Sequence, residues 1–362
     1  MRIDKAMIIV LAALPLFAGC AAPRVADVPM QVLVPVLYAT NRSLAATPDA
    51  EELYTSGRGP VSYGIATVAL STRKQGDSPF ADWSRWKPRM DASRSRNEIL
   101  KVQPLDASTF AARLRGDGRT GARRPVLLYV HGYRRDFEIV AMETAALAYE
   151  TGADAVPMFF SWPSSNSVFG YTGDTTSMRW AAADLRDTLK YLLGQPTTGR
   201  VHIVAHSLGA RGLLEALDDL VRDDTARLDR LGEIVLASPD VDSDLFRRDY
   251  LPVLRKLGVR ATLYATENDV PLQASQRVNR YKRLGDARAE IFIDRGIETV
   301  VYSDVVTFFN SHDAIVEIGD LQADLHYLLE EGLGASERPT LAAVDTEQGR
   351  YWRAHPYANR TP

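Results

Sequence analysis

The sequence is poor in cysteine, in clustered basic charge and in long apolar runs. Cys20 is its single cysteine, which excludes an internal disulfide bond. Lys and Arg total 43 against 46 Asp and Glu, a net charge of −3, and no basic cluster of the kind that nucleic-acid binding needs stands out. No internal repeat and no low-complexity linker interrupts the 362 residues, which are 46% hydrophobic. One large folded domain is therefore the simplest expectation.

The first twenty residues have the pattern of a secretory signal. Arg2 and Lys5 precede an apolar stretch at 6–18 that is too short to span a bilayer comfortably. The run Phe17-Ala18-Gly19-Cys20 resembles the lipobox of bacterial lipoproteins, in which the cysteine is lipidated and becomes the new N-terminus. We expect residues 1–19 to be removed and residues 20–30 to form a lipidated tether to a membrane of the bacterial envelope. Ala21, in place of an aspartate that retains such proteins at the inner membrane, favours the outer membrane of a Gram-negative cell.

The middle of the chain alternates apolar strands with helical patterns. Two strands rich in β-branched residues are expected at 32–38 and 61–70, and the polar stretch 71–124 predicts loops and one short helix. Further strands are expected at 126–130, 155–160, 201–205, 234–237 and 259–265, and within 291–301. Helices are expected at 137–150 and 208–220 and around the apolar repeats of 181–192 and 318–328.

This alternation predicts an α/β fold with a doubly wound, mostly parallel sheet, because largely apolar strands suit a sheet that is buried on both faces. The predicted domain spans residues 31–334, with 31–124 as an N-terminal elaboration of strands and loops. Residues 335–362 are interpreted as a C-terminal tail.

The most informative stretch is 201–210, VHIVAHSLGA, in which an apolar strand ends, Ser207 lies on a turn and a helix begins. Ala205 and Gly209 stand two residues before and after Ser207, which is the G-x-S-x-G nucleophile elbow with alanine in the first small position. The tight turn requires small residues at both places. The alternative is a buried serine that only caps the helix.

A serine hydroxyl needs a general base, and the chain order of such hydrolases is serine, acid, histidine. His312 is the candidate base, because among six histidines it alone follows the last strand and opens a helix. Asp269, after the strand 259–265, is the candidate acid that would orient the imidazole. Asp240 is its rival and Glu267 a more distant one.

Two backbone N–H groups should form the oxyanion hole. One is expected from Leu208, directly after the nucleophile, and the other from Tyr133, after the strand that ends at His131-Gly132. Tyr171 and Trp180, with the loop expected at 170–173, are candidates for shaping the pocket. No cluster of metal-ligating residues stands out, so neither a metal nor an organic cofactor is expected.

With these residues in place, the chain resembles the α/β-hydrolase family catalogued as DUF900, a group of esterase-like bacterial proteins that are often lipoproteins. The family often has glycine before the catalytic histidine, where this chain has Ser311. The resemblance implies a triad of Ser207, Asp269 and His312 and leaves the substrate undefined. The matching stretches are 37–42 (LYATNR), 63–66, 130–133 with Phe137, 160–163 (FSWP), 205–209, 237–240 and 263–269 (LYATEND).

The predicted reaction is hydrolysis of a small carboxylic ester through an acyl-enzyme. Two alternatives remain open from the sequence. The domain could be a catalytically idle envelope lipoprotein that binds a partner or a glycan, although an idle copy would tend to lose part of the serine, acid and histidine set. It could also be an acyltransferase that uses the same triad.

Overall fold

The computed structural model describes residues 30–46, 53–72, 97–115, 123–165, 167, 170–196, 198–223, 225–302 and 319–354. The strands of this part of the chain are β1 (Met30–Leu44), β2 (Tyr54–Thr72), β3 (Glu98–Pro104), β4 (Val126–Val130), β5 (Val156–Ser161), β6 (Val201–His206), β7 (Leu231–Ala237), β8 (Ala261–Thr266), β9 (Glu298–Tyr302), β10 (Leu341–Thr346) and β11 (Gly349–Ala354). The helices are α1 (Ala107–Leu114), α2 (Phe137–Thr151), α3 (Tyr171–Gly194), α4 (Leu208–Val221), α5 (Ser243–Leu245), α6 (Leu251–Leu257), α7 (Val270–Asn279) and α9 (Gly319–Leu329), with short turns at η4 (Leu228–Arg230) and η5 (Phe246–Tyr250).

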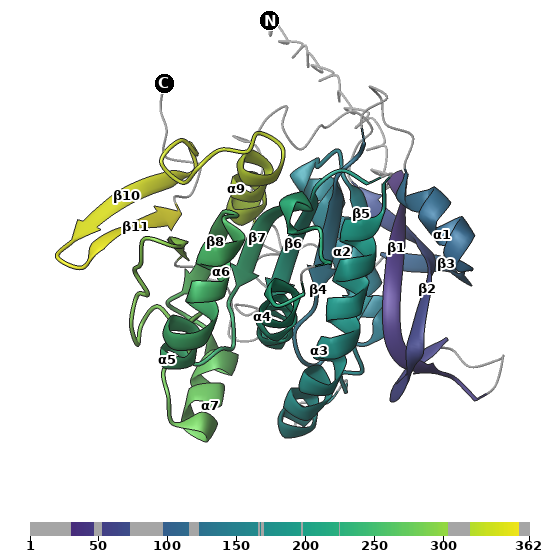
Figure 1. Cartoon of the computed structure of the whole chain (residues 1–362), viewed down its shortest axis with the longest axis horizontal. Helices are drawn as coiled ribbons and strands as arrows, with labels where there is room; N and C mark the ends of the chain where they lie inside the picture. The colour runs from purple at the N-terminus through teal and green to yellow at the C-terminus, as the bar shows by residue number, and fades with distance from the viewer. Residues whose placement is uncertain are drawn as a thin grey trace, which may run out of the picture.

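These strands form one sheet in the order β10-β11-β9-β8-β7-β6-β4-β5-β1-β2-β3 (Figure 1). Neighbouring strands run parallel from β11 through to β1. Only the pairs at the two edges, β1–β2, β2–β3 and β10–β11, are antiparallel. The prediction of a mostly parallel sheet is confirmed. The parallel arrangement brings the carboxyl ends of β4, β6, β7 and β8 together, where sites in such folds are found.

Both faces of the sheet are covered, and strand β4 shows how. Leu128 and Val130 belong to one hydrophobic cluster, together with residues of α1, α3, α4 and α6. Leu127 and Tyr129 belong to the other cluster, together with residues of α2 and α9. Successive side chains of a strand point to opposite faces, so a run that is apolar at every position is what burial between two helical layers requires.

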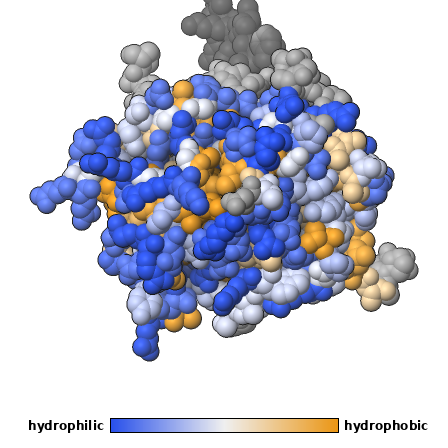
Figure 2. Space-filling view, viewed as in Figure 1, coloured by the Kyte–Doolittle hydropathy of each residue, from blue (hydrophilic) through white to orange (hydrophobic). Residues whose placement is uncertain are grey.

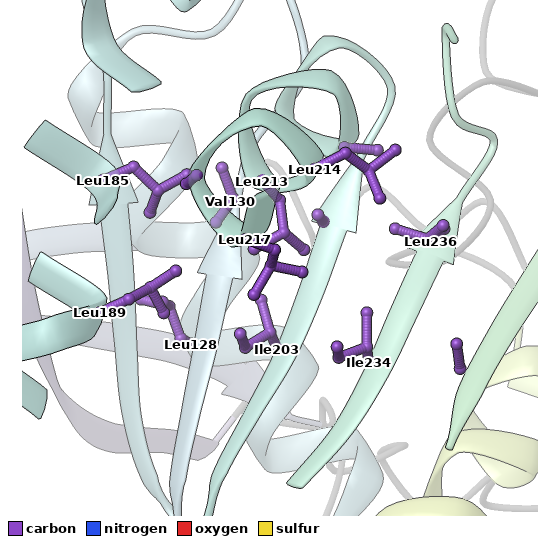
Figure 3. Packing of buried hydrophobic residues seen from close by; sticks show 14 of the residues in the cluster. Leu128, Val130, Leu185, Leu189, Ile203, Leu213, Leu214, Leu217, Ile234 and Leu236 are labelled. Atoms are coloured by element: carbon purple, nitrogen blue, oxygen red, sulfur yellow. The ribbon is translucent and has the colours of Figure 1, made fainter. Parts of the chain in front are cut away.

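Helix α4 holds the elbow against the sheet. In Figure 3 the leucines of α4 and α3 lie over the strands β4, β6 and β7, with apolar side chains filling the space between the layers. All of these side chains are fully buried: Leu128, Val130, Leu185, Leu189, Ile203, Leu213, Leu214, Leu217, Ile234 and Leu236. Each such side chain contributes about 1.5–3 kcal/mol relative to exposure, so the start of α4, where the candidate nucleophile lies, is rigidly supported.

Three edge strands were not predicted. Strand β3 lies within the stretch 71–124, which was interpreted as loops and one short helix; α1 is such a helix, whereas β3 pairs with β2 at the sheet edge. Strands β10 and β11 lie within 335–362, interpreted as a tail, and β11 continues the sheet beside β9. Most side chains of β3 (EILKVQP) and β10 (LAAVDT) are exposed or only partly buried, and neither strand is an uninterrupted apolar run like β4.

The face of the molecule seen in Figure 2 is mainly hydrophilic. Figure 2 shows charged and polar side chains over most of this face, with hydrophobic side chains gathered near its middle. Among the residues that the structure describes, no helix combines the length and the apolar character that crossing a membrane requires.

Candidate active site

Ser207 lies on a sharp turn between β6 and α4. Its backbone has φ 53° and ψ −119°, a region that side-chain-bearing residues rarely adopt because the Cβ atom crowds the backbone. The turn is fixed by its neighbour β7: the Ser207 N–H donates to the Ala237 carbonyl at 3.0 Å, and the Ser207 carbonyl accepts from Asp240 N–H at 3.2 Å. Ser207 occupies the N-cap position of α4, yet its side chain makes no capping hydrogen bond. This geometry is that of a nucleophile elbow and does not fit a serine that serves to cap the helix.

Two glycines let the elbow approach the end of β4. A Cβ atom on Gly209 would lie 2.4 Å from the His131 carbonyl oxygen and 2.5 Å from that of Val130. A Cβ atom on Gly132 would lie 2.9 Å from the Cβ of Ser207. The peptide after β4, where the sequence places the second oxyanion donor, is therefore packed directly against the candidate nucleophile.

His131 orients that peptide. Its Nε2 accepts a hydrogen bond from Trp162 N–H at 3.1 Å, so a neutral ring has its proton on Nδ1, which lies 2.7 Å from the Gly132 carbonyl oxygen and donates to it. Burial and then the charge of Arg42 lower the pKa of His131 well below its usual value, which keeps the ring neutral. The ring also stacks on Trp162, with centroids 4.8 Å apart. Because N–H and C=O of a trans peptide point in opposite directions, holding the Gly132 carbonyl fixes the direction of Tyr133 N–H.

The rival acid Asp240 is buried and bonded to side chains of two helices. The Tyr171 hydroxyl donates to one of its carboxylate oxygens at 2.6 Å, and the Ser275 hydroxyl donates to the other at 2.6 Å. The guanidinium of Arg283 lies 3.4 Å from the second oxygen. Burial and the charge of Asp240 raise the pKa of Tyr171, so its hydroxyl stays protonated. Asp240 therefore joins α3 and α7 beside the elbow.

Of the two residues proposed to shape the pocket, Tyr171 begins α3 and packs edge-on against Tyr133, with centroids 5.9 Å apart. The interpretation of 170–173 as a loop was wrong, because these residues form the start of α3 with Gly170 at its N-cap. Trp180 lies nine residues further along α3, beneath the guanidinium of Arg58.

Asp269 follows β8 and is fully buried. One of its carboxylate oxygens accepts from Leu272 N–H at 2.7 Å, which makes it the N-cap of α7 and fixes its rotamer. Glu267 instead forms an ion pair with Arg353 of β11 at 3.0 Å. His312, the candidate base, and Cys20, the candidate lipidation site, lie outside the described residues, as does Ser311.

The other histidines of the described chain have structural partners. His202 Nδ1 accepts from Glu233 N–H at 3.1 Å, as expected for a core residue. His326 Nδ1 lies 2.8 Å from the Thr151 carbonyl oxygen, which joins α9 to the end of α2. In the ranges that the structure covers, no group of His, Cys, Asp and Glu is arranged to hold a metal ion.

Unusual backbone conformations gather at this edge of the sheet. Among the described residues other than glycine, positive φ occurs at Arg134 (57°), Ser207 (53°), Ser238 (42°) and Arg280 (70°). Ser207 and Ser238 directly follow β6 and β7, and Arg134 lies in the loop between β4 and α2. Such conformations cost about 1–3 kcal/mol each and are retained where the surroundings impose them, typically at functional sites.

Two side chains that contact the loop between β4 and α2 were missed in the sequence. Asp174, in the first turn of α3, accepts from Arg134 N–H at 3.2 Å, and Ser164 Oγ accepts from Arg135 N–H at 3.2 Å. Their local signals, an acidic residue at a helix start and a serine after a strand, are common and point to no partner. The contact joins residues 40 positions apart, which only the folded chain reveals.

The family comparison agrees with this architecture. The family described as "Alpha/beta hydrolase of unknown function (DUF900)" matches residues 107–305, more than half of the chain. No curated protein matches the sequence. Among solved structures, the chain is similar to the product of gene lin2722 from Listeria innocua, with 12% identity, a TM-score of 0.34, and coverage of 60% of this chain and 97% of the other. The chain belongs to the DUF900 family of α/β hydrolases.

Proposed function

We propose that the protein is a serine esterase that hydrolyses small carboxylic esters. Ser207 Oγ attacks the ester carbonyl carbon while His312 takes its proton, and Asp269 holds the imidazole and stabilises its cation. The tetrahedral oxyanion accepts hydrogen bonds from the N–H groups of Tyr133 and Leu208. His312 returns the proton to the leaving alcohol, and a water molecule, activated in the same way, releases the acid from the acyl-enzyme.

The observation that supports this proposal most is the strained backbone of Ser207, packed against Gly132 without a side-chain capping bond. A serine that only capped the helix would place its hydroxyl on a backbone N–H of the first turn, and Ser207 does not. Leu208 is the first residue of α4, and the N–H groups of a helix start have no partner within the helix, so they are suited to a developing negative charge. Asp269, buried directly after β8, is the preferred acid, and Asp240, whose carboxylate accepts from Tyr171 and Ser275, is the alternative.

The test is labelling by a fluorophosphonate probe, with wild-type protein compared with Ser207→Ala, together with hydrolysis of p-nitrophenyl esters of increasing chain length. We expect labelling and turnover in the wild type and neither in the variant. Equal labelling of both would refute Ser207 as the nucleophile, and a wild type that neither labels nor hydrolyses would favour the idle, partner-binding lipoprotein. Ester products formed with added alcohols in preference to free acid would favour the acyltransferase.

The proposed location is the bacterial cell envelope, through lipid attached to Cys20, with the outer membrane of a Gram-negative cell as the preferred site. The support is the signal-like N-terminus with Cys20 directly after it. Several acyl chains on one residue, at about 0.8 kcal/mol for each buried CH₂, would hold the domain firmly to a bilayer. Metabolic labelling with an alkyne fatty acid should be lost in Cys20→Ser, and labelling that persists there would refute the anchor.

A further inference from the structure

Four consecutive peptide units of the loop between β4 and α2 are each held by one side chain. His131 binds the Gly132 carbonyl, as described above. The next unit donates Arg134 N–H to Asp174, and the one after it donates Arg135 N–H to Ser164 Oγ. The fourth presents the Arg135 carbonyl to the guanidinium of Arg42 at 2.6 Å. A loop of this kind normally leaves such groups to water, so a complete set of side-chain partners fixes its conformation.

Asp174 is the centre of this arrangement. It is 2% exposed, and its Oδ2 accepts from both Arg134 N–H and the Ser164 hydroxyl, the latter at 2.5 Å. Its Oδ1 accepts from the N–H and the hydroxyl of Ser165, at 2.8 and 2.9 Å. The carboxylate thus joins the loop after β4 to the loop after β5, and it holds Arg134 in its left-handed conformation, with φ 57°.

Arg42 binds the same two loops from β1. It is 2% exposed and donates to the Ser161 hydroxyl at 2.8 Å and to the Ser164 carbonyl at 3.2 Å, besides the Arg135 carbonyl. Asp174 therefore accepts hydrogen bonds from N–H groups of these loops, whereas Arg42 donates hydrogen bonds to their carbonyl oxygens. Ser164 contacts both charged side chains. We call Arg42, Ser164 and Asp174 the loop clamp.

We infer that the loop clamp is a positioning device for the oxyanion hole, and that Asp174 is its principal residue. The inference rests on the proposed esterase function. None of the three residues needs to touch the substrate. They fix the peptide units directly after Tyr133, so that Tyr133 N–H is aimed at the oxyanion before the substrate binds, and no reorganisation is needed during the reaction.

The prediction concerns Asp174→Asn. In the wild type each carboxylate oxygen of Asp174 accepts two hydrogen bonds. In the variant an NH₂ group replaces one of these oxygens, so two donors of the loops face another donor and their hydrogen bonds are lost. We expect kcat to fall about 10- to 100-fold, because a displacement near 1 Å in a catalytic group has an effect of that order. KM should change less than about twofold, since the substrate in its ground state gains little from the oxyanion hole.

The experiment measures kcat and KM for a p-nitrophenyl ester, with the active enzyme counted by fluorophosphonate titration. It also measures inhibition by a trifluoromethyl ketone, which forms a tetrahedral adduct with the serine. In Asp174→Asn the inhibitor should weaken by the same factor as kcat/KM falls. The matched control is Asp184→Asn, the same change on the same helix, where the carboxylate binds the Asn41 side chain at 2.8 Å and does not contact the loop.

Ser164→Ala serves as a second variant in case Asp174→Asn does not fold, since it removes only a hydroxyl. A kcat and inhibitor affinity like those of Asp184→Asn, in whichever variants fold, would overturn the positioning role. A loss of stability without a change in kcat per titrated site would do the same. If the wild type itself shows no Ser207-dependent turnover, the proposed function fails first and the inference fails with it, an outcome that the Ser207→Ala comparison separates from the others.

Discussion

Replacing Gly209 by alanine sets helix propensity against the packing of the elbow. Gly209 is the second residue of α4, and alanine there favours the helix by about 1 kcal/mol. Its new methyl group would lie 2.4 Å from the His131 carbonyl oxygen and 2.5 Å from that of Val130. Both are backbone atoms of the end of β4 and the loop that follows it, so no side-chain rotation relieves the contact.

The size of the effect follows from the distance that must be gained. A carbon and a carbonyl oxygen approach to about 3.3–3.6 Å at closest, so the start of α4 and the end of β4 must separate by roughly 1 Å. Overpacking of this kind costs about 1–3 kcal/mol, which the helix preference only partly offsets. The activity should suffer more, because the displacement separates Ser207 from the Tyr133 peptide. We expect about a 100-fold loss of kcat.

The assay combines ester hydrolysis with urea unfolding, and Gly194→Ala is the control. Gly194 ends α3, and a methyl group there would meet nothing within 4 Å, so this variant should keep full activity and gain about 0.5–1 kcal/mol. The reasoning is refuted if Gly209→Ala is as active as the wild type and as stable as Gly194→Ala.

Two further predictions concern the acid and the pH dependence of stability. Asp269→Asn should lower kcat about 10⁴-fold by favouring the wrong imidazole tautomer, whereas Asp240→Asn, which disturbs a hydroxyl network, should cost far less; the opposite ranking would transfer the role to Asp240. Burial, and then the charge of Arg200, lower the pKa of His202 to about 4 from 6.5. Below pH 6.5 the unfolded chain therefore binds a proton at this residue, whereas the folded chain binds it only near pH 4. The free energy of unfolding should therefore decrease as the pH is lowered through that window, by about 2 kcal/mol from pH 8 to pH 5 for this residue alone. In His202→Asn, urea unfolding at pH 8 and pH 5 should show a loss of stability that is smaller by this amount than in the wild type, and an equal loss in both proteins would contradict the prediction. The comparison with the wild type is needed because burial raises the pKa of neighbouring Glu233, which changes the stability in the opposite direction.

The parts of the fold that the sequence predicted are those buried on both faces. Strand β4 was expected at the residues it occupies, and α4 and α2 within a residue or two at their ends, because their apolar patterns record contact with the sheet. Strand β3, with the sequence EILKVQP, has alternating partial burial at an edge and looks like any polar segment. The hairpin of β10 and β11 escapes detection for the same reason, since pairing through backbone groups leaves no trace in the side chains.

The candidate site divides along similar lines. The elbow at Ser207 was predictable because its demands are local: a strand, a small residue on each side, and a helix. The position of the Tyr133 peptide beside the turn was predictable because it follows the His131-Gly132 strand end, and its role as oxyanion donor stays a prediction. The partners of Asp174 and Arg42 were not predictable, because they are backbone groups of loops distant in sequence, and any residue can supply such groups. The stretch LYATNR was recognised only as a resemblance, and the hydrogen bonds of Arg42 give it a physical reason.

Arg42 acts on the loop between β4 and α2 in two ways that reinforce each other. It binds the Arg135 carbonyl at the far end of the loop, and at the near end its charge adds to burial in lowering the pKa of His131. A protonated His131 would have two donors and would lose the bond that its Nε2 accepts from Trp162 N–H. The neutral ring keeps that bond and still donates to the Gly132 carbonyl. Burying a cation among carbonyls and hydroxyls is a poor way to gain stability, since apolar packing of similar volume often does as well or better. The position of Arg42 is therefore better explained by the loop geometry that it imposes on Tyr133.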